Sequence, residues 1–405
     1  MMDPSHQIGW WGQSEADDAA FAVAYLHRLR FTRDAFDVTN RLLSDILITD
    51  GDSPARVLVF VDGGVANAWP DLDNRISRYA SAYADRMILA GPPCTVAGGE
   101  VSKNDWSVFE AVARAIKDSS ICRHSYVLVI GGGAVLDTVG FAAATAHRGV
   151  RLVRLPTTTL SQADSGVGVK NGINAFGKKN FLGTFAPPWA VINDEVFLST
   201  LSDRDWRCGL SEAVKVALVK SERFFEQIVA GVPRLRKRDH AALRPVIRRS
   251  AEIHFRHIVD GGDPFELREG RPLDFGHWSA HKLEEMTNFC LKHGEAVAIG
   301  IALDVVYSAM SGLLEWSDVK RILDCLTGLG FAVSHSALAD SGVLLDGLEE
   351  FREHLGGRLT ITLLNGVGRP VDVHDIDRPV MIQAADWLRA AVARRAVWRT
   401  LEEHV

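Results

Sequence analysis

The stretch Val127-Leu-Val-Ile-Gly-Gly-Gly-Ala-Val-Leu-Asp137 decides the fold that we expect for this chain. An apolar strand runs into Gly131, Gly132 and Gly133, and the residues that follow start a helix. Glycine lets the backbone approach a phosphate closely, and the first amides of a helix supply donors and a favourable dipole. The spacing is not GxGxxG, so the ordinary Rossmann fingerprint does not apply. The stretch therefore predicts an α/β domain that cradles a pyrophosphate; the alternative is a tight strand-to-helix turn without a ligand.

Apolar segments on both sides of this stretch predict the rest of a sheet. Expected strands lie at residues 57–61, 87–90, 126–130, 151–155 and 190–192, and expected helices lie at 106–117 and 134–146. Strands that alternate with helices are typical of a mostly parallel sheet. The first 50 residues are mixed, with a helical tendency and polar interruptions.

The character of the chain changes beyond about Leu198. Expected helices lie at residues 212–225, 241–259, 278–287, 295–313, 317–329 and 380–403, with one β-like piece at 359–364. We therefore predict two domains. The first is an α/β dinucleotide-binding domain over residues 1–198, which includes an N-terminal extension, and the second is a mainly α-helical domain over residues 199–405.

The composition argues against several classes of protein. Hydrophobic residues make up 47% of the 405 residues, which is typical of a globular chain. No apolar run reaches the roughly 18 to 20 residues that span a bilayer, and residues 1–7 lack the features of a secretory signal. The net charge is −6 without a long basic tract, so we expect neither a nucleic-acid nor a membrane partner. The five cysteines form no CxxC pair, which favours a cytoplasmic protein without a disulfide framework.

Three residues far apart in the chain form a candidate metal site. Glu212 lies in Gly-Leu-Ser-Glu-Ala-Val-Lys, His277 in Leu-Asp-Phe-Gly-His, and His293 in Lys-His-Gly-Glu-Ala-Val. Two imidazoles and one carboxylate suit a divalent metal with open coordination positions, as a catalytic zinc site requires. A metal together with a dinucleotide indicates an enzyme that moves a hydride at a metal-held alcohol.

A series of motifs carries a family resemblance. In chain order these are Gly131-Gly-Gly-Ala-Val-Leu-Asp137, His147-Arg-Gly-Val-Arg151, Leu155-Pro-Thr-Thr-Thr159, Asp164-Ser-Gly-Val-Gly-Val-Lys170, Gly177-Lys-Lys-Asn180, and the contexts of Glu212, His277 and His293. Over roughly residues 55 to 370, their order and spacing resemble the 3-dehydroquinate synthase-like sugar phosphate cyclases. The resemblance implies an N-terminal NAD-binding α/β domain, a helical domain that binds a divalent metal (zinc or cobalt), and an active site in the cleft between them.

The resemblance also implies roles for individual residues. Glu212, His277 and His293 match the metal ligands. The positions that match cofactor contacts are Asp62, Glu100, Lys103, Gly131, Gly132, Gly133, Asp137, Thr157 and Thr158. The positions that match substrate-site or catalytic residues are Asp164, Lys170, Lys179, Asn180, Lys215, His281 and Arg256, the last of which aligns with a lysine of the family. Arg148 matches an arginine that reaches the neighbouring subunit's phosphate site, which implies a homodimer. His254 and His257 have no such context, so we expect them to be structural or solvent-facing.

The implied reaction is redox-neutral overall. NAD takes a hydride from the metal-held alcohol, phosphate leaves by elimination beside the new ketone, and the hydride returns. The ring then opens, and an intramolecular aldol step closes a carbocycle. Lys170, Lys179 and Arg148 would supply cations for the phosphorylated sugar, with Asn180 as a neutral donor. The glycines and asparagines around the two lysines suit a ligand-binding loop.

Several positions depart from the dehydroquinate synthases. Gly270 replaces the arginine that reads a substrate carboxylate, although Arg271 lies next to it, and Asp274 replaces an asparagine. These changes resemble the cyclases that act on sedoheptulose 7-phosphate, which has no carboxylate, and residues 169–185 look most like the EboD-type branch. We therefore expect a neutral sugar phosphate as the substrate. The alternatives are 3-dehydroquinate synthesis, a metal-dependent polyol dehydrogenase, and a non-catalytic homologue.

Overall fold

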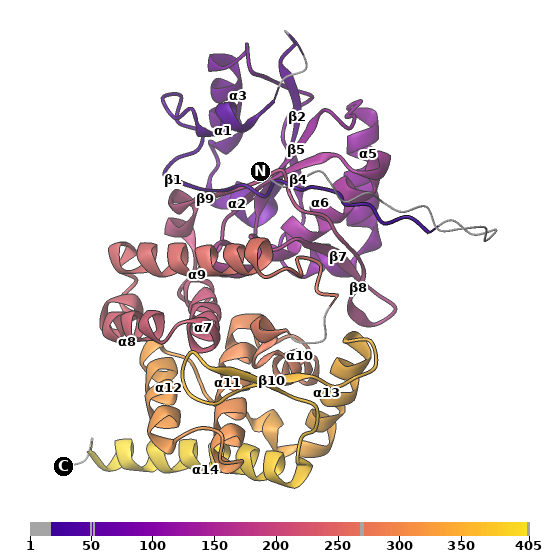
Figure 1. Cartoon of the computed structure of the whole chain (residues 1–405). Coiled ribbons are helices and arrows are strands. Elements are labelled where there is room, and N and C mark those ends of the chain that lie inside the picture. Colours follow the sequence, from indigo (N-terminus) through magenta and orange to yellow (C-terminus); the bar gives the residue numbers. More distant parts are fainter. Residues whose placement is uncertain (1–17, 49–50, 52, 268–270, 403–405) are drawn as a thin grey trace, which may run out of the picture.

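The computed structural model describes residues 18–48, 51, 53–267 and 271–402. Figure 1 shows an α/β part and a helical part, with helix α9 (His240–Asp260) running between them. In the described part of the chain, no helix is both long enough and apolar enough to span a membrane. The predicted combination of an α/β N-terminal part and a helical C-terminal part is confirmed, whereas the predicted domain boundary at residue 198 stays a prediction.

The α/β part is built on a parallel sheet. Its strands are β1 (Leu29–Thr32), β2 (Ala55–Asp62), β3 (Met87–Leu89), β4 (Cys94–Val96), β5 (Tyr126–Gly131), β6 (Arg151–Pro156) and β9 (Ala190–Asp194). The strand order is β1-β9-β6-β5-β2-β3, and β4 pairs with β2. Each of these pairings is parallel, as the alternation of strands and helices predicts.

Both faces of the sheet are covered, because successive side chains of a strand enter two different cores. In β2, Val57 and Val59 belong to one core, whereas Leu58 and Phe60 belong to the other. The helices of this part are α1 (Leu42–Ile46), α2 (Gly63–Ala68), α3 (Leu72–Ala82), α4 (Val101–Asn104), α5 (Trp106–Asp118) and α6 (Gly133–Thr145). Helix α3 contributes to the first core, and α5 and α6 contribute to the second. Burial on both faces explains why the strands read as continuous apolar runs.

The carboxyl ends of the parallel strands meet at one edge of the sheet. Strand β2 ends at Asp62, β5 ends at Gly131, and β6 ends at Pro156, just before Thr157. Ligands of open parallel sheets bind in the crevice at this edge. Residues from this edge and from the helical part line the same cavity.

An antiparallel hairpin occupies the stretch for which we expected a ligand-binding loop. It consists of β7 (Lys170–Ala175) and β8 (Lys178–Phe185), in which Gly172 pairs with Gly183. A Cβ atom on Gly172 would lie only 2.8 Å from the Leu182 carbonyl oxygen. The expectation of a loop was wrong because these glycines allow two strands to approach closely rather than breaking them.

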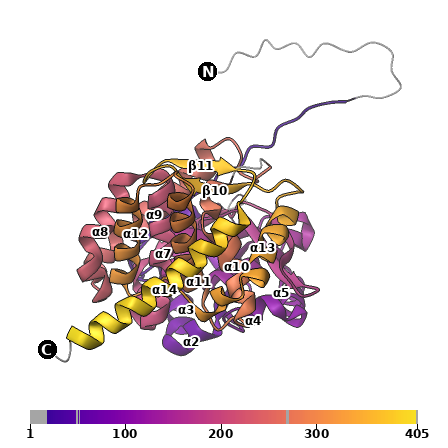
Figure 2. The ribbon, with the colours of Figure 1, turned by 90° about the horizontal axis from the view of Figure 1, so that it is seen from below.

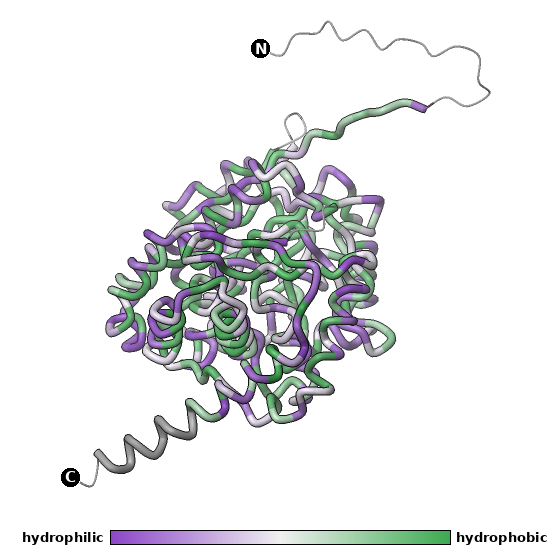
Figure 3. Tube along the Cα trace, turned by 60° about the horizontal axis from the view of Figure 1, so that its bottom comes forward, coloured by the Kyte–Doolittle hydropathy of each residue, from purple (hydrophilic) through white to green (hydrophobic). Residues whose placement is uncertain are grey.

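The beginning of the described chain is extended rather than helical. Residues 18–24 lead away from the body of the protein (Figure 2), and Figure 3 shows that much of this stretch is apolar. Tyr25 then packs edge-on against Phe265, and His27 Nε2 lies 2.8 Å from the Val167 carbonyl oxygen. Strand β1 follows and pairs in parallel with β9. Before residue 49, α1 is the only helix among the described residues. The predicted helical tendency was wrong here, because pairing with a distant strand overrides local propensity.

The helical part has one large core. Its elements are α7 (Asp203–Lys220), α8 (Glu222–Arg236), α9, α10 (His277–Met286), α11 (His293–Met310), α12 (Trp316–Leu329), α13 (Ser341–His354), α14 (Arg378–Glu402) and the hairpin of β10 (Ile361–Leu364) and β11 (Pro370–Val373). The predicted helix at residues 212–225 had wrong bounds. The Ser202 hydroxyl accepts from the Asp205 N–H and starts α7, and the extended backbone of Ser221 separates α7 from α8. Helix α13 and strand β11 were not expected.

Candidate active site

A cavity of about 1090 Å³ lies between the two parts of the molecule. Among the residues singled out in the sequence, those that line it are Asp62, Glu100, Lys103, Gly132, Gly133, Asp137, Thr157, Thr158, Asp164, Lys170, Lys179, Asn180, Lys215, Arg271, Asp274, His277, His281 and His293. They come from strand ends and helices of the α/β part, from the hairpin and from four regions of the helical part. The fold therefore gathers residues that are up to 231 positions apart, from Asp62 to His293, around one space.

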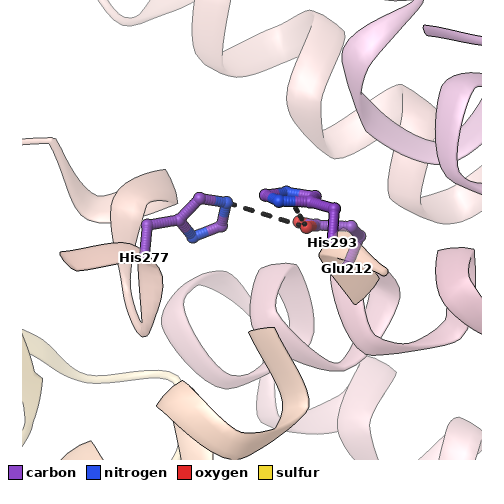
Figure 4. A group of neighbouring side chains, drawn as sticks. All are labelled: Glu212, His277 and His293. Carbon is purple, nitrogen blue, oxygen red and sulfur yellow. Dashed lines mark ion pairs between the residues drawn. The ribbon is translucent and has the colours of Figure 1, made fainter. Parts of the chain in front are cut away.

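Glu212, His277 and His293 come together in the helical part (Figure 4). The two histidines line the cavity, whereas Glu212 is fully buried beside them and does not line it. Their potential ligand atoms all lie within 4.8 Å of one another. Nε2 of His293 is 3.3 Å from Glu212 Oε1, and Nε2 of His277 is 3.7 Å from the same oxygen. Helices α7, α10 and α11 each supply one of the three side chains. Two imidazoles and a carboxylate in this arrangement could hold one divalent cation.

The second nitrogen of each imidazole is held by another group. His277 Nδ1 lies 3.1 Å from the Phe275 carbonyl oxygen, and His293 Nδ1 lies 3.1 Å from Glu284 Oε2. Contacts of this kind fix the tautomer and the ring orientation of metal-binding histidines. Both rings therefore present Nε2 to Glu212, as a shared metal would require.

The carboxylate of Glu212 is buried and ionised, as a metal ligand in this place would need to be. The residue is 0% exposed, and no donor among the described residues meets Oε1 in hydrogen-bond geometry. Burial raises the pKa of Glu212, but the Lys215 ammonium, 2.6 Å from Oε2, helps hold this pKa below its ordinary value. A buried, ionised oxygen without a donor fits a metal ligand, because a cation would supply the missing partner.

A second group of potential ligands overlaps the first. His281, Glu284 and His293 also have ligand atoms within 4.8 Å of one another. Both oxygens of Glu284 are already engaged, since Lys179 Nζ lies 2.9 Å from Oε1 and His293 Nδ1 lies 3.1 Å from Oε2. Burial, together with the nearby His277 and Lys179, holds the pKa of His281 well below its ordinary value. We therefore assign Glu284 to the orientation of His293 and favour the group that contains Glu212.

The lysines of the cavity are held by acids. Lys170 Nζ lies 2.6 Å from Glu266 Oε2, and Lys215 Nζ lies 3.5 Å from Asp164 Oδ2 in addition to its contact with Glu212. Burial lowers the pKa of Lys215, but Asp164 and Glu212 raise it above its ordinary value, so this lysine stays cationic. The exposed Lys170 is available to an anionic group that displaces Glu266, whereas Lys215 is almost fully buried and is held between Asp164 and Glu212.

The sheet edge has the features of a phosphate cradle. Gly132 precedes α6 without a capping side chain, which leaves the first amides of the helix for a ligand. A Cβ atom on Gly133 would lie 2.9 Å from Ser165 Oγ, a buried hydroxyl for which the described residues provide no hydrogen-bond partner. Lys103 Nζ donates to Asp137 Oδ2 over 2.8 Å across the same wall. Ser165 was not among the predicted site residues, although it lies within the motif from Asp164 to Lys170.

Among the described residues, four singled-out positions do not line the cavity: Gly131, Arg148, Glu212 and Arg256. Gly131 ends β5 behind the wall, and Gly270 lies outside the described residues. Arg148 is exposed and does not line the cavity of its own chain. The side chain of Arg256 is 70% exposed and pairs with Asp260 one turn along α9. Because this side chain is on the outer face of the helix, it does not line the cavity of its own chain. The predicted role of Arg256 at the substrate stays a prediction.

His254, two residues earlier on α9, takes the place that we expected for Arg256. Its side chain is 14% exposed, it lines the cavity, and Nδ1 lies 2.5 Å from Asp164 Oδ1. His254 is therefore not solvent-facing, whereas the alternative of a structural role stays a prediction, and His257 also lines the cavity. The helical period contains a usable signal: His254 lies four residues after the buried Ser250, on the inward face of α9.

The amino-acid sequence matches two family models. Residues 93–208 match the family described as 3-dehydroquinate synthase N-terminal, and residues 209–347 match 3-dehydroquinate synthase C-terminal. The chain is 32% identical over 368 residues to a 2-epi-5-epi-valiolone synthase of Streptomyces glaucescens, covering 89% of this chain and 91% of the relative. It is 35% identical over 339 residues to a 3-dehydroquinate synthase of Nitrobacter winogradskyi, covering 81% and 85%.

Solved structures have the same fold. ValA, a 2-epi-5-epi-valiolone synthase of Streptomyces hygroscopicus subsp. jinggangensis with NAD+ and Zn2+ bound, is 27% identical with a TM-score of 0.83 and covers 92% of this chain and 99% of its own. A 2-deoxy-scyllo-inosose synthase with carbaglucose-6-phosphate, NAD+ and Co2+ has a TM-score of 0.71 at 21% identity, covering 88% and 95%. Together with the sequence matches, these findings show that the chain belongs to the 3-dehydroquinate synthase-like sugar phosphate cyclases.

Proposed function

We propose that this cyclase converts a neutral phosphorylated ketose, of the sedoheptulose 7-phosphate type, to a carbocycle with phosphate elimination. The observation that carries the proposal is Asp274, which lines the cavity three residues before His277. Burial raises the pKa of Asp274, but Lys170, His277, Lys215 and Arg271 together lower it to about 2. An ionised carboxylate in the wall repels a substrate carboxylate, whereas it accepts hydrogen bonds from the hydroxyls of a neutral sugar.

We propose NAD and one divalent metal as the cofactors. Similarity to ValA, which has NAD+ and Zn2+ bound, supports this, and the cobalt of the 2-deoxy-scyllo-inosose synthase leaves both metals as candidates. Glu212, His277 and His293 would hold the metal, and the Gly132–Gly133 turn would hold the NAD pyrophosphate. When bound, the metal polarises a substrate hydroxyl and NAD accepts and returns a hydride.

The remaining residues have roles that follow from their positions. Lys179 and Lys170 on the hairpin supply cations for the substrate phosphate. His254, oriented by Asp164, is placed to take up the proton that a substrate hydroxyl loses during oxidation. Lys215 keeps Asp164 ionised; burial raises the pKa of this carboxyl, but Lys215 and His254 hold it well below its usual range.

Synthesis of 3-dehydroquinate is the second candidate, and Arg271 is the observation that favours it. The side chain of Arg271 is 15% exposed and lines the cavity, with NH1 3.6 Å from Glu266 Oε2. If a substrate carboxylate displaced Glu266, Arg271 would bind it. A metal-dependent polyol dehydrogenase is a third candidate, and it differs from both cyclases because NADH would accumulate in step with product.

The deciding experiment is phosphate release from a panel of substrates by the purified protein with NAD and zinc or cobalt. We expect sedoheptulose 7-phosphate, or a related neutral sugar phosphate, to release phosphate at least about tenfold faster than the acidic dehydroquinate precursor, because an unpaired carboxylate loses roughly 1.5 to 3 kcal/mol. The Asp274→Asn variant should narrow the difference between the rates of phosphate release from the neutral and the acidic substrates. Turnover of the acidic precursor alone would overturn the substrate assignment, and stoichiometric NADH would overturn the cyclase reaction.

A further inference from the structure

Asp304 is a buried carboxylate that the proposed reaction does not use. It lies in α11, three turns after His293, within the apolar core of the helical part. The residue is 0% exposed and forms no ion pair among the described residues. Its neighbours along the helix, Leu303 and Val305, are fully buried as well. A carboxylate in such surroundings costs free energy unless donors satisfy it.

Two donors satisfy Asp304, and they flank His277. The Gly276 N–H donates to Asp304 Oδ2 over 3.0 Å, and the Trp278 indole Nε1–H donates to Asp304 Oδ1 over 2.9 Å. Burial raises the pKa of Asp304 to about 7, although both hydrogen bonds lower it. An apolar side chain of similar size would be buried here at a lower cost in folding free energy. Burial alone therefore does not explain why a carboxylate occupies this position.

The geometry of Gly276 supplies the reason. Its φ of +77° forms the left-handed turn from which α10 starts, and a Cβ atom there would lie 2.9 Å from the Ile301 backbone nitrogen. The first turn of α10 is therefore pressed against α11, and Asp304 holds it from both sides of His277. At the opposite end of the helix pair, Glu284 of α10 holds His293 of α11. Each helix thus holds the metal-binding histidine region of the other.

We propose that Asp304 is a positioning residue that holds the first turn of α10 so that His277 Nε2 faces Glu212. The inference rests on the proposed metal site of Glu212, His277 and His293. Asp304 touches neither metal nor substrate in this scheme; it acts through Gly276 and Trp278. Loss of either hydrogen bond lets the His277 ring move away from the shared oxygen, which weakens metal binding without removing a ligand.

The test compares three variants of the full chain with the wild type. Asp304→Asn keeps one acceptor but turns an amide N–H2 toward the other donor, and Trp278→Phe removes one donor while it retains most of the buried volume. Val305→Ala, at the neighbouring position of the same helix, leaves a core cavity but keeps the Asp304 carboxylate that accepts from Gly276 and Trp278, and it serves as the matched control. Cobalt affinity is measured by competition with a chromophoric chelator, the cobalt absorption bands report ligand geometry, and thermal unfolding of the metal-free protein reports stability.

We expect Asp304→Asn and Trp278→Phe to bind Co2+ about 10- to 100-fold more weakly than the wild type, with shifted or weakened visible bands. Val305→Ala should lower the unfolding temperature while it keeps wild-type affinity and bands. The inference is overturned if the first two variants behave like Val305→Ala. If the wild type itself binds no divalent metal, the proposed metal site fails, and that result is recognisable because it appears before any substitution is made.

Discussion

At the scale of single residues, a shift of two positions along α9 decides whether a side chain lines the cavity or lies in solvent. A helix turns by about 100° per residue, so residues two apart point to nearly opposite sides. His254 contacts Asp164 inside the cavity, whereas the side chain of Arg256 is 70% exposed. Matching a motif by residue type favoured the cationic Arg256, and only the burial of the helix face identifies His254.

We predict that His254→Asn lowers kcat by about 10²-fold or more, as the loss of a proton-transferring group does, while Arg256→Gln leaves kcat and KM unchanged. The two variants form a matched pair because they alter neighbouring positions of one helix. Steady-state phosphate release measures both. An equal loss of activity in the two variants, or a loss of activity in Arg256→Gln alone, would support the role first assigned to Arg256.

The metal prediction concerns Glu212, His277 and His293. The purified protein should hold about one divalent metal per chain, and replacement of any one of the three by alanine should abolish stable binding. Elemental analysis after gel filtration measures the content, with Arg256→Gln as the control that retains the metal. Full metal content in all three alanine variants would show that another group, such as His281 with Glu284, holds the ion.

At the scale of elements, the site depends on pairs of segments that hold each other in place. The β7–β8 hairpin carries Lys170 and Lys179, and the α10–α11 pair carries His277 and His293. Neither pair is visible as such in the sequence, because strand pairing and helix contacts form between separate segments. Small residues mark where these contacts are closest, as Gly172 and Gly276 show.

The hairpin prediction uses Gly172→Ala. The added Cβ atom would lie 2.8 Å from the Leu182 carbonyl oxygen, so the two strands must shift apart at this point. We expect the shift to displace Lys179, which lies on the same strand as Leu182. We expect KM for the sugar phosphate to rise by about tenfold, equivalent to about 1.4 kcal/mol of lost binding, with a smaller change in kcat. Gly91→Ala, where a Cβ atom meets nothing within 4 Å, is the control. Unchanged KM in Gly172→Ala would mean that the hairpin does not position the phosphate-binding lysine.

A pH prediction follows from the contact between α10 and α11. The pKa of Asp304 is raised from the ordinary value of 3.8 to about 7 in the folded protein, so the folded state binds a proton more strongly than the unfolded state. Its contribution to stability is therefore fully present below about pH 4 and is lost as the pH rises towards 7. Chemical denaturation of the metal-free protein between about pH 4.5 and about pH 7.5 measures how the free energy of unfolding changes with pH. Asp304→Asn should flatten it; an identical slope in the variant would assign the pH dependence to other groups.

At the scale of the whole molecule, the cavity exists only because two differently built parts face each other. The sheet edge contributes the glycine turn, and the helical part contributes the candidate metal ligands. Arg148 lies outside this cavity on the surface of its own chain. We propose, as the family resemblance implies, that the arginine serves the phosphate site of a second copy in a homodimer.

Mixed dimers test this arrangement. Arg148→Ala and Glu212→Ala should each be inactive alone, yet their co-expression should restore activity. Half of the dimers would be mixed and each would contain one complete site, so we expect about a quarter of the wild-type activity. Phosphate release by the purified mixture measures it. If Arg148→Ala is fully active alone, or if mixing restores nothing, the residue does not act across a dimer interface.

The sequence by itself determined the parallel sheet, the helical second half, the glycine turn and the three candidate metal ligands. It could do so because continuous apolar runs, helical periods and local motifs are properties of short segments. Only the tertiary structure decided that Glu284 orients His293, that His254 rather than Arg256 enters the cavity, and that Asp304 reaches both sides of His277. These features depend on which faces of separate elements meet, and the physical reason is that burial and hydrogen-bond partners are set by packing between segments rather than by residues within one.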